Sequence, residues 1–211
     1  RPGAHLLQDL PPSDSSTPLD SALICETLNS PGSPTVLFKS NGRHSIISVL
    51  SPGSWRLEFF AQTERLFLEN LHCEDTLEGH SVINTPLSTS QFWDVLRYLM
   101  DLKKVESGSR DVPFWAGFLG YFSYEMGLAC LPHPKDHSHN FSVEDSEDPV
   151  DASLLWTERS VVLDHESGRV TVQSTREADN QPAGWLDETM RLLQDISSHP
   201  AVDNVDSITT N

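Results

Sequence analysis

The chain has 211 residues, and its 14 Lys and Arg stand against 31 Asp and Glu, which gives a formal net charge of −17. This acidic balance argues against nucleic-acid binding, because neutralising phosphates requires clustered cations. With 37% hydrophobic residues and five Trp, the chain can bury a core and is neither collagen-like nor wholly disordered. No apolar run approaches the about 20 residues that a membrane helix needs, so we predict no membrane span.

Both ends of the sequence have the composition of linkers. Residues 1–19 contain four prolines among Ser and Asp, and residues 198–211 are again mostly polar. Segments of this kind bury too little apolar surface to offset the entropy lost on ordering. We therefore predict a linker or tail at each end and one domain over residues 20–197, a usual size for a single domain.

The cysteines and the first residues bear on localisation. The sequence has an odd number of cysteines, widely spaced at Cys25, Cys73 and Cys130. Such usage favours a reducing compartment over a disulfide framework. Residues 1–19 lack the basic and apolar stretches of a signal peptide. We expect a cytoplasmic protein and, because the sequence begins with Arg1, an excerpt from a longer chain.

The first part of the domain predicts a helix and then strands. Asp20 suits the N-cap of a short helix that extends to Leu28. Farther on, Asn41-Gly42 and Pro52-Gly53 are strong turn signals. They separate strands that we predict over Thr35–Phe38, Arg43–Leu50 and Ser54–Phe60, with a further strand over Arg65–Leu71. Antiparallel pairing of consecutive strands is the simplest arrangement.

The strongest helix signal begins at Ser88. Ser88-x-x-Gln91 has the spacing of a capping box, and the basic pair Lys103-Lys104 suits a helix end. Between them, apolar residues recur at helical intervals, at Phe92, Val95, Leu96, Leu99 and Met100. The 3.6-residue period accounts fully for this stripe, so we assign it to core packing rather than to a ligand site.

An aromatic segment, Pro113–Glu125, predicts a strand. Gly117 and Gly120 lie inside it, and glycine in a strand marks a bulge or the close approach of another backbone. Apolar side chains alternate imperfectly along the segment, so both faces of this strand are apolar and both require cover.

The last third of the domain predicts a loop, a hairpin and a helix. Residues 132–151 are rich in His, Asp, Glu, Pro and Ser, as in a long surface loop. We predict a hairpin of Leu154–Asp164 with Arg169–Ser174. A final helix runs from Gly184 to about Ser197, with apolar residues on one side.

A histidine cluster in the predicted loop could hold a metal ion. His133, His137 and His139 lie close together beside Asp136. The loop has no regular element to preorganise these ligands, so a solvated acidic and histidine-rich loop is the favoured interpretation. The acidic runs at 144–151 and 203–206 lack calcium-loop spacing, and we interpret them as solvated faces.

Two serine pairs do not fit a hydrolase. Ser45 beside His44, and Ser123 near Glu125, both lack the Gly-x-Ser-x-Gly elbow that exposes a nucleophile. Gly117-x-x-Gly120 has too few glycines for a nucleotide fingerprint. We predict no catalytic residue and no metal site in this chain.

Three segments taken together carry a family resemblance. They are Val36–Ser40 followed by Gly42–Ile47, then Val112–Gly127, then Trp156–His165. In order and spacing they resemble the N-terminal region of component I of the chorismate-utilising synthases. This family contains anthranilate synthase and 4-amino-4-deoxychorismate synthase, also called para-aminobenzoate synthase. Val112–Gly127 is closer to the para-aminobenzoate enzymes that have an amidotransferase domain fused ahead of component I, and the resemblance covers about residues 21–174.

The resemblance implies an α+β fold of antiparallel sheets packed with helices, joined to a C-terminal chorismate-binding domain. In the family, ammonia from a glutamine amidotransferase replaces a chorismate hydroxyl in a magnesium-dependent reaction. The C-terminal domain carries the magnesium carboxylates and nearly all chorismate contacts, and nothing after Ser174 resembles it. We therefore expect no cofactor in this chain and no activity from the chain alone.

The leading hypothesis is the N-terminal domain of a para-aminobenzoate synthase that serves folate formation. The same resemblance leaves open anthranilate synthase component I, of tryptophan biosynthesis. A third alternative is a non-catalytic binding module that kept the fold and lost the partner domain.

One effector site of the family reaches this region. A Leu-Leu-Glu-Ser motif helps bind tryptophan in feedback-inhibited anthranilate synthases, and Leu37-Phe38-Lys39-Ser40 corresponds to it. Ser40 matches, whereas Lys39 replaces the acid and would repel an ammonium group. Ser40 could equally well simply end a core strand.

The other residues that the resemblance singles out are assigned to architecture. Two glycines are turn or packing positions, a tyrosine is a hydrogen-bonding phenol, and an arginine anchors the domain interface. With two further motif positions, the set comprises Arg43, Ser45, Gly117, Gly120, Tyr121 and Tyr124.

Overall fold

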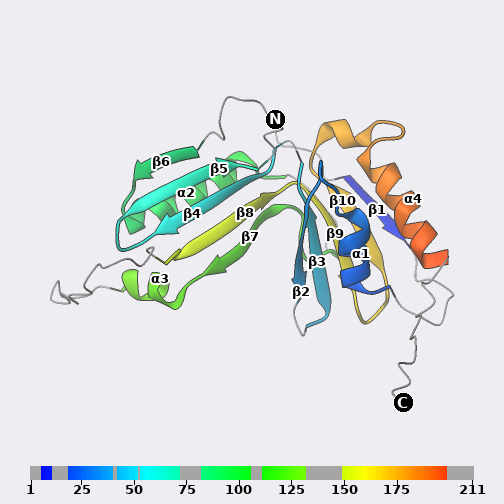
Figure 1. The fold of residues 1–211 in the computed structure, drawn as a ribbon, viewed down its shortest axis with the longest axis horizontal. Helices are drawn as coiled ribbons and strands as arrows, with labels where there is room; N and C mark the ends of the chain where they lie inside the picture. The colour runs from blue at the N-terminus through cyan, green and yellow to red at the C-terminus, as the bar shows by residue number, and fades with distance from the viewer. Residues whose placement is uncertain are drawn as a thin grey trace, which may run out of the picture.

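The computed structural model describes residues 6–10, 19–39, 42–51, 53–71, 82–105, 111–131 and 149–198. This part of the chain forms two five-stranded sheets, which lie on either side of the molecule and meet near its middle (Figure 1). The first sheet has the order β1 (Leu6–Leu10), β10 (Val170–Ser174), β9 (Arg159–Asp164), β3 (His44–Val49), β2 (Thr35–Lys39). The second has the order β6 (Val82–Pro86), β5 (Arg65–Asn70), β4 (Trp55–Phe60), β8 (Ala152–Thr157), β7 (Gly117–Phe122).

Each sheet has its own helices. The helices α1 (Ser21–Leu28) and α4 (Trp185–Ser198) pack on the first sheet, and α2 (Thr89–Leu102) and α3 (Tyr124–Ala129) contribute to the core of the second. A short 3₁₀ helix, η1 (Glu177–Asn180), precedes α4. All the strand pairings are antiparallel. The predicted α+β class of antiparallel sheets packed with helices is therefore confirmed.

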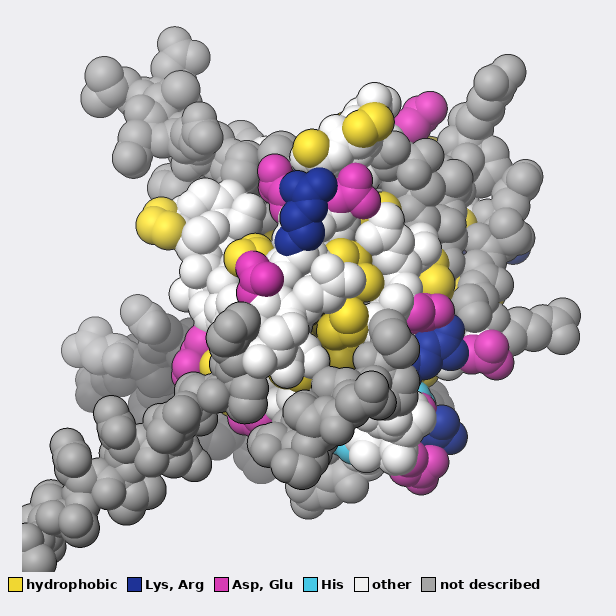
Figure 2. Space-filling view, turned by 90° about the vertical axis from the view of Figure 1, so that its right-hand side faces the viewer, with side chains coloured by type: hydrophobic (Ala, Val, Ile, Leu, Met, Phe, Trp, Pro, Cys, Tyr) yellow, Lys and Arg dark blue, Asp and Glu magenta, His cyan; other side chains and the backbone are white. Residues whose placement is uncertain are grey.

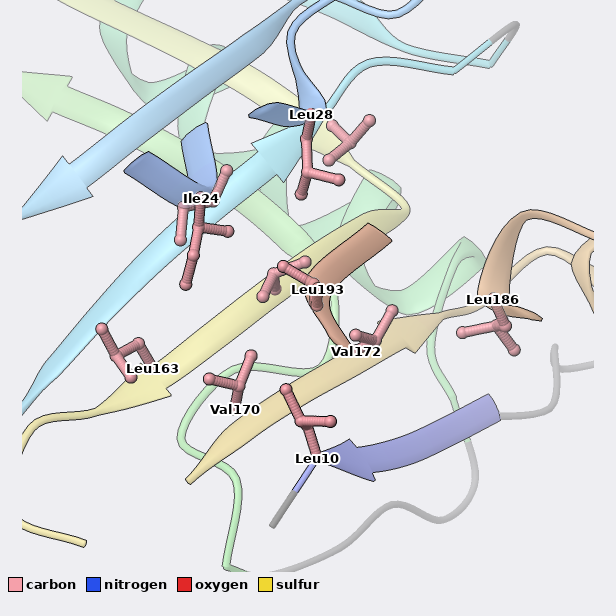
Figure 3. Packing of buried hydrophobic residues seen from close by; sticks show 11 residues of the cluster. Leu10, Ile24, Leu28, Leu163, Val170, Val172, Leu186 and Leu193 are labelled. Carbon is pink, nitrogen blue, oxygen red and sulfur yellow. The ribbon is translucent and has the colours of Figure 1, made fainter. Parts of the chain in front are cut away.

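The first core lies between the first sheet and its two helices (Figure 3). Ile24 and Leu28 of α1 are four residues apart and lie on one helix face. Leu186 and Leu193 of α4 are seven residues apart, about two turns, and also share a face. They pack against Val172 and other buried residues of the sheet. Each such buried side chain contributes about 1.5–3 kcal/mol. Figure 2 views the molecule from the right-hand side of Figure 1. Hydrophobic side chains gather near the middle of that surface, with acidic and basic side chains beside them.

The second core is aromatic. Phe59 of β4 stacks on Phe92 of α2 with ring centroids 4.4 Å apart, and both side chains are fully buried. The predicted capping box of α2 is confirmed, because Ser88 N–H donates to Gln91 Oε1 at 2.9 Å and Gln91 N–H donates to Ser88 Oγ at 3.4 Å. The predicted helices at both ends of the domain are also confirmed as α1 and α4.

One predicted strand pairing and the extent of one predicted strand are wrong because the chain crosses between the sheets, whereas the predicted hairpin is confirmed by the pairing of β9 with β10. The strands β3 and β4 are consecutive but lie in different sheets. The segment Leu154–Asp164, predicted as one strand, is divided at Glu158 into β8 and β9. The pattern of buried residues gives the reason. Leu154 packs in the second core and Val161 in the first, so the core-facing residues are even-numbered in β8 and odd-numbered in β9.

Three further predictions need correction. Residues 1–19 are not wholly a linker, because β1 pairs with β10 and buries Leu10. Here pairing with a distant strand outweighs the surrounding Pro and Ser. The strand β6 was not predicted. The aromatic run is a strand only over β7, because Ser123 then begins α3 by accepting a hydrogen bond from the Met126 N–H at 3.0 Å.

Candidate functional site

An apolar cavity of about 360 Å³ lies between the two sheets. The first sheet contributes Val36 and Phe38 from its edge strand β2, and the second contributes Leu119, Gly120 and Tyr121 from β7. Ser153 and Leu155 of β8 and Arg56 of β4 also line it. The structure thus brings together two of the three family-like segments, which are about 80 residues apart in the sequence.

Strand register explains why these side chains meet. Alternate residues of a strand point to opposite faces. Leu37 packs against the first core, so Val36 and Phe38 point away from it. In the second sheet, Leu155 lies opposite Arg56 on one side and Leu119 on the other. These three residues form a row across the sheet on the face that lines the apolar cavity.

The three residues of the effector-like motif have different positions. Phe38 lines the apolar cavity. The Lys39 ammonium lies 3.4 Å from Oδ1 of Asp20, and both side chains are more than half exposed. Ser40 lies outside the described residues. Because Asp20 places a carboxylate beside Lys39, the charge at this end of β2 is balanced, although such an exposed pair contributes at most about 1 kcal/mol.

Arg43 and Ser45 hold the end of β3 to the turn after β9. The Arg43 guanidinium donates two hydrogen bonds to Asp164, at 3.0 and 2.6 Å. These bonds keep the pKa of the Asp164 carboxyl well below its usual range. Ser45 is fully buried, and its Oγ lies 2.8 Å from Nε2 of His165. The histidine partner of the Ser45 hydroxyl in the structure is therefore His165, and the sequence had suggested His44.

The two glycines of the second segment are required for different reasons. Gly117 has φ +129°, a conformation that side-chain-bearing residues rarely adopt. A Cβ on Gly120 would lie only 1.9 Å from the backbone oxygen of Ser153. Tyr121 and Tyr124 are 55% and 77% exposed. For Tyr121, no hydroxyl hydrogen bond occurs within the described ranges, so the predicted hydrogen-bonding role finds no support there.

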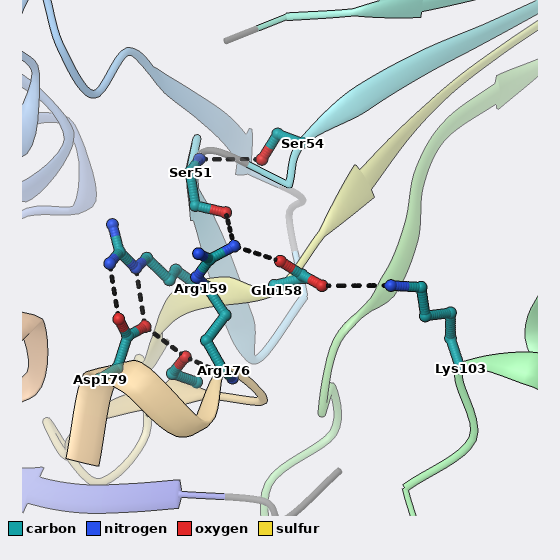
Figure 4. Close-up of polar contacts among 8 residues, drawn as sticks. Ser51, Ser54, Lys103, Glu158, Arg159, Arg176 and Asp179 are labelled. Carbon is teal, nitrogen blue, oxygen red and sulfur yellow. Dashed lines mark hydrogen bonds and ion pairs between the residues drawn. The ribbon is translucent and has the colours of Figure 1, made fainter. Parts of the chain in front are cut away.

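A polar network that the sequence did not suggest lies where the chain crosses between the sheets (Figure 4). Glu158, the residue between β8 and β9, accepts a hydrogen bond from Arg176 Nη1 at 2.8 Å. Its second oxygen is 3.6 Å from the Lys103 ammonium. Arg176 Nη1 also lies 3.4 Å from Ser51 Oγ, in the β3–β4 connection. The network therefore joins four segments of the chain at this crossing.

A second ion pair supports the same crossing. Arg159 donates to both carboxylate oxygens of buried Asp179, at 2.7 and 2.6 Å. Burial alone would raise the pKa of Asp179, but hydrogen bonds from Arg159 and Ser174, with the nearby arginine charges, outweigh it and lower that pKa. The sequence contains one signal for these residues, since Glu158-Arg159 interrupts an apolar run, and buried charges need partners.

The described residues do not fit a magnesium site. In those ranges there is no group of three or more His, Cys, Asp or Glu side chains that could hold a metal ion. The histidines of the 132–151 loop and most of its acidic residues lie outside the described part of the chain. No helix in the described part is both long and apolar enough to cross a membrane.

One sequence comparison agrees with the resemblance of the three segments. No protein-family model matches the chain. The fold is that of an α+β domain, and the sequence is similar to a chorismate-utilising synthase. Over 152 residues the chain is 24% identical to "Putative aminodeoxychorismate synthase" of Schizosaccharomyces pombe, a match that covers 72% of this chain and 20% of that protein. The chain therefore spans about a fifth of this curated relative, and the predicted resemblance to the chorismate-utilising synthases is confirmed.

One solved structure is similar to this chain. Anthranilate synthase component I from Streptococcus pneumoniae TIGR4 matches 87% of this chain and 35% of that chain, with 19% sequence identity and a TM-score of 0.42.

Proposed function

We propose that this chain is the N-terminal region of an aminodeoxychorismate synthase, which aminates chorismate with glutamine-derived ammonia for folate biosynthesis. The observation that carries the proposal is the sequence match to a protein of that name over 72% of the chain. The para-aminobenzoate character of Val112–Gly127 supports the same choice within the family. Anthranilate synthase component I is the alternative that differs only in its product.

In this proposal the region supplies a docking scaffold rather than the reacting groups. Chorismate and magnesium bind to a C-terminal domain, and a glutamine amidotransferase domain or subunit supplies ammonia. The docking surface is the face of the second sheet that carries Arg56, Leu155 and Tyr121. Arg56 and Tyr121 are exposed there, whereas the opposite face is covered by α2. Beside Arg56, which is ion-paired with Glu69, this face presents Leu119 and Leu155, which a partner domain can cover.

The apolar cavity favours a second candidate function, the binding of a small effector. Ligand sites are mostly apolar hollows of about 300–1,000 Å³, and this one has about 360 Å³ with Phe38 and Leu119 in its wall. Arg56 also lines it, and its guanidinium is ion-paired with Glu69 at 2.6 Å. A non-catalytic binding module would use this cavity without any chorismate-binding partner.

Reconstitution tests the proposed function. The chain, a chorismate-binding domain of the component I type, or both together are incubated with chorismate, ammonia and magnesium, and products are identified by mass spectrometry. We expect aminodeoxychorismate only when both are present. Anthranilate instead would select the alternative synthase. Turnover by the chain alone, or equal turnover by the domain without the chain, would contradict the scaffold role.

A further inference from the structure

A second cavity lies where α2 ends against the segment that leads into β7. It has a volume of about 140 Å³, and six of the residues that line it are Lys103, Lys104, Trp115, Ala116, Gly117 and Trp156. We call it the tryptophan cavity. It shares no lining residue with the apolar cavity, and the proposed function assigns it no role.

Flat aromatic groups form two parts of its wall. Trp156 is only 3% exposed, and its ring stacks on Trp55 with centroids 5.7 Å apart and an interplanar angle of 8°. Phe118 contacts the same ring edge-on at 5.1 Å. These contacts fix the position of Trp156, and the indole of Trp115 is half-buried and donates to the Val112 carbonyl at 2.9 Å. Rigid indole walls favour a planar apolar ligand.

Two adjacent lysines give the tryptophan cavity a local positive charge in a chain of net charge −17. The Lys103 ammonium is 6.0 Å from the centroid of the Trp156 ring, and its ion pair with Glu158 is long, at 3.6 Å. The Lys104 side chain makes no ion pair within the described ranges. The lysines also complement the C-terminus of α2, but that role does not require a cavity with aromatic walls.

The backbone beside the tryptophan cavity is strained. Ala116 has φ +101° and Gly117 has φ +129°. For Ala116, which carries a Cβ, such a conformation costs about 1–3 kcal/mol and persists only where the surroundings fix it. Strain of this kind gathers at ligand sites. Ala116→Gly would remove this cost, because glycine adopts positive φ freely.

We propose that the tryptophan cavity binds a small aromatic carboxylate. The single ring lies against the indoles of Trp115 and Trp156, and the carboxylate pairs with the ammonium groups of Lys104 and Lys103. The volume of about 140 Å³ limits the ligand to about one ring. The site is independent of the proposed synthase function, because none of its residues belongs to the apolar cavity or the docking surface.

Titration with benzoate as the probe tests this site. The 211-residue chain is titrated at constant ionic strength while the indole N–H signals are followed by NMR. Trp115→Phe and Trp156→Phe variants assign two of these signals. We expect saturable shifts at Trp115 and Trp156 with benzoate. Benzamide, which keeps the ring but lacks the charge, and acetate, which lacks the ring, should each bind at least tenfold more weakly.

Matched variants separate a specific site from bulk charge. Lys104→Met should weaken benzoate binding at least threefold, while Arg97→Met, which removes a cation elsewhere on α2, should leave it unchanged. Circular dichroism checks that both variants remain folded. The proposal is overturned by benzamide binding as tightly as benzoate, by shifts confined to the other tryptophans, by no saturation, or by equal effects of the two variants.

Discussion

In the first sheet, β9 and β10 are buried on the face turned away from α1 and α4, whereas in the second sheet the face turned away from α2 is open. On the buried face, Ser160 and Gln173 are each 1% exposed, and Gln173 donates a hydrogen bond to the carbonyl of Phe114 in the segment before β7. On the open face, Tyr121 is 55% exposed. The first sheet is thus covered by the chain itself, while the second presents a surface that a partner domain can cover.

The largest effect is expected in the helix-covered core of the second sheet. Phe59→Ala removes a fully buried ring that stacks on Phe92 and should cost about 3–5 kcal/mol of unfolding free energy. Tyr98→Ala, at a 65% exposed position of α2, should change it by less than about 0.5 kcal/mol. Urea unfolding measures both. Equal midpoints would show that the second sheet has no core of its own.

The next effect concerns the edge strand β7. Gly120→Val would force a side chain against the backbone of Ser153 and should cost about 3 kcal/mol, the upper range for overpacking. Gly127→Ala is the control, because no atom lies within 4 Å of its would-be Cβ and alanine favours a helix. It should leave stability unchanged or raise it by up to about 1 kcal/mol. A tolerated Gly120→Val would disprove the close approach of β7 and β8.

A smaller effect is expected at the crossing between the sheets. Asp179→Asn removes the buried partner of Arg159 and should cost about 1.5–3 kcal/mol at pH 7. The pKa of Asp179 is lowered in the folded state, so its contribution is fully present above the unfolded pKa of about 4. It is lost as the pH falls from about 5 through the lowered folded pKa. The difference between wild type and variant in urea unfolding should therefore shrink at acid pH, and a constant difference would contradict this assignment.

The smallest effect is expected at the exposed end of β2. Lys39→Met removes a pair with Asp20 in which both side chains are more than half exposed, and it should change the unfolding free energy by at most about 1 kcal/mol. Thermal unfolding at low and high salt measures this. A loss comparable to that of Asp179→Asn would mean that the end of β2 is held much more firmly than its exposure indicates.

The features that the sequence predicted correctly are those that depend on neighbouring residues alone. The capping box at Ser88 and Gln91 and the close approach at Gly120 both follow from residue type and spacing. The strand β1 was missed because pairing with β10, more than 150 residues away, decides its structure. The break at Glu158 has a signal in the charged pair Glu158-Arg159, but that it separates strands of two sheets follows only from the core that each residue enters.

The apolar cavity could not be predicted for the same reason. Phe38 and Gly120 each belong to a family-like segment, but their meeting depends on how the two sheets are placed beside each other. Contacts of this kind arise from tertiary packing, on which propensity and spacing carry little information. The sequence resemblance could therefore select the residues, but not the cavity that they form.

The most direct test of the account concerns the open face of the second sheet. Two arginine substitutions are compared at similarly exposed tyrosines, Tyr121→Arg on the open face and Tyr98→Arg on α2, which are 55% and 65% exposed in the wild type. Affinity for a chorismate-binding domain of the component I type is measured by calorimetry. We predict that Tyr121→Arg weakens binding at least tenfold while Tyr98→Arg leaves it unchanged. Equal affinities for both variants, or a loss confined to Tyr98→Arg, would contradict the docking role of this face.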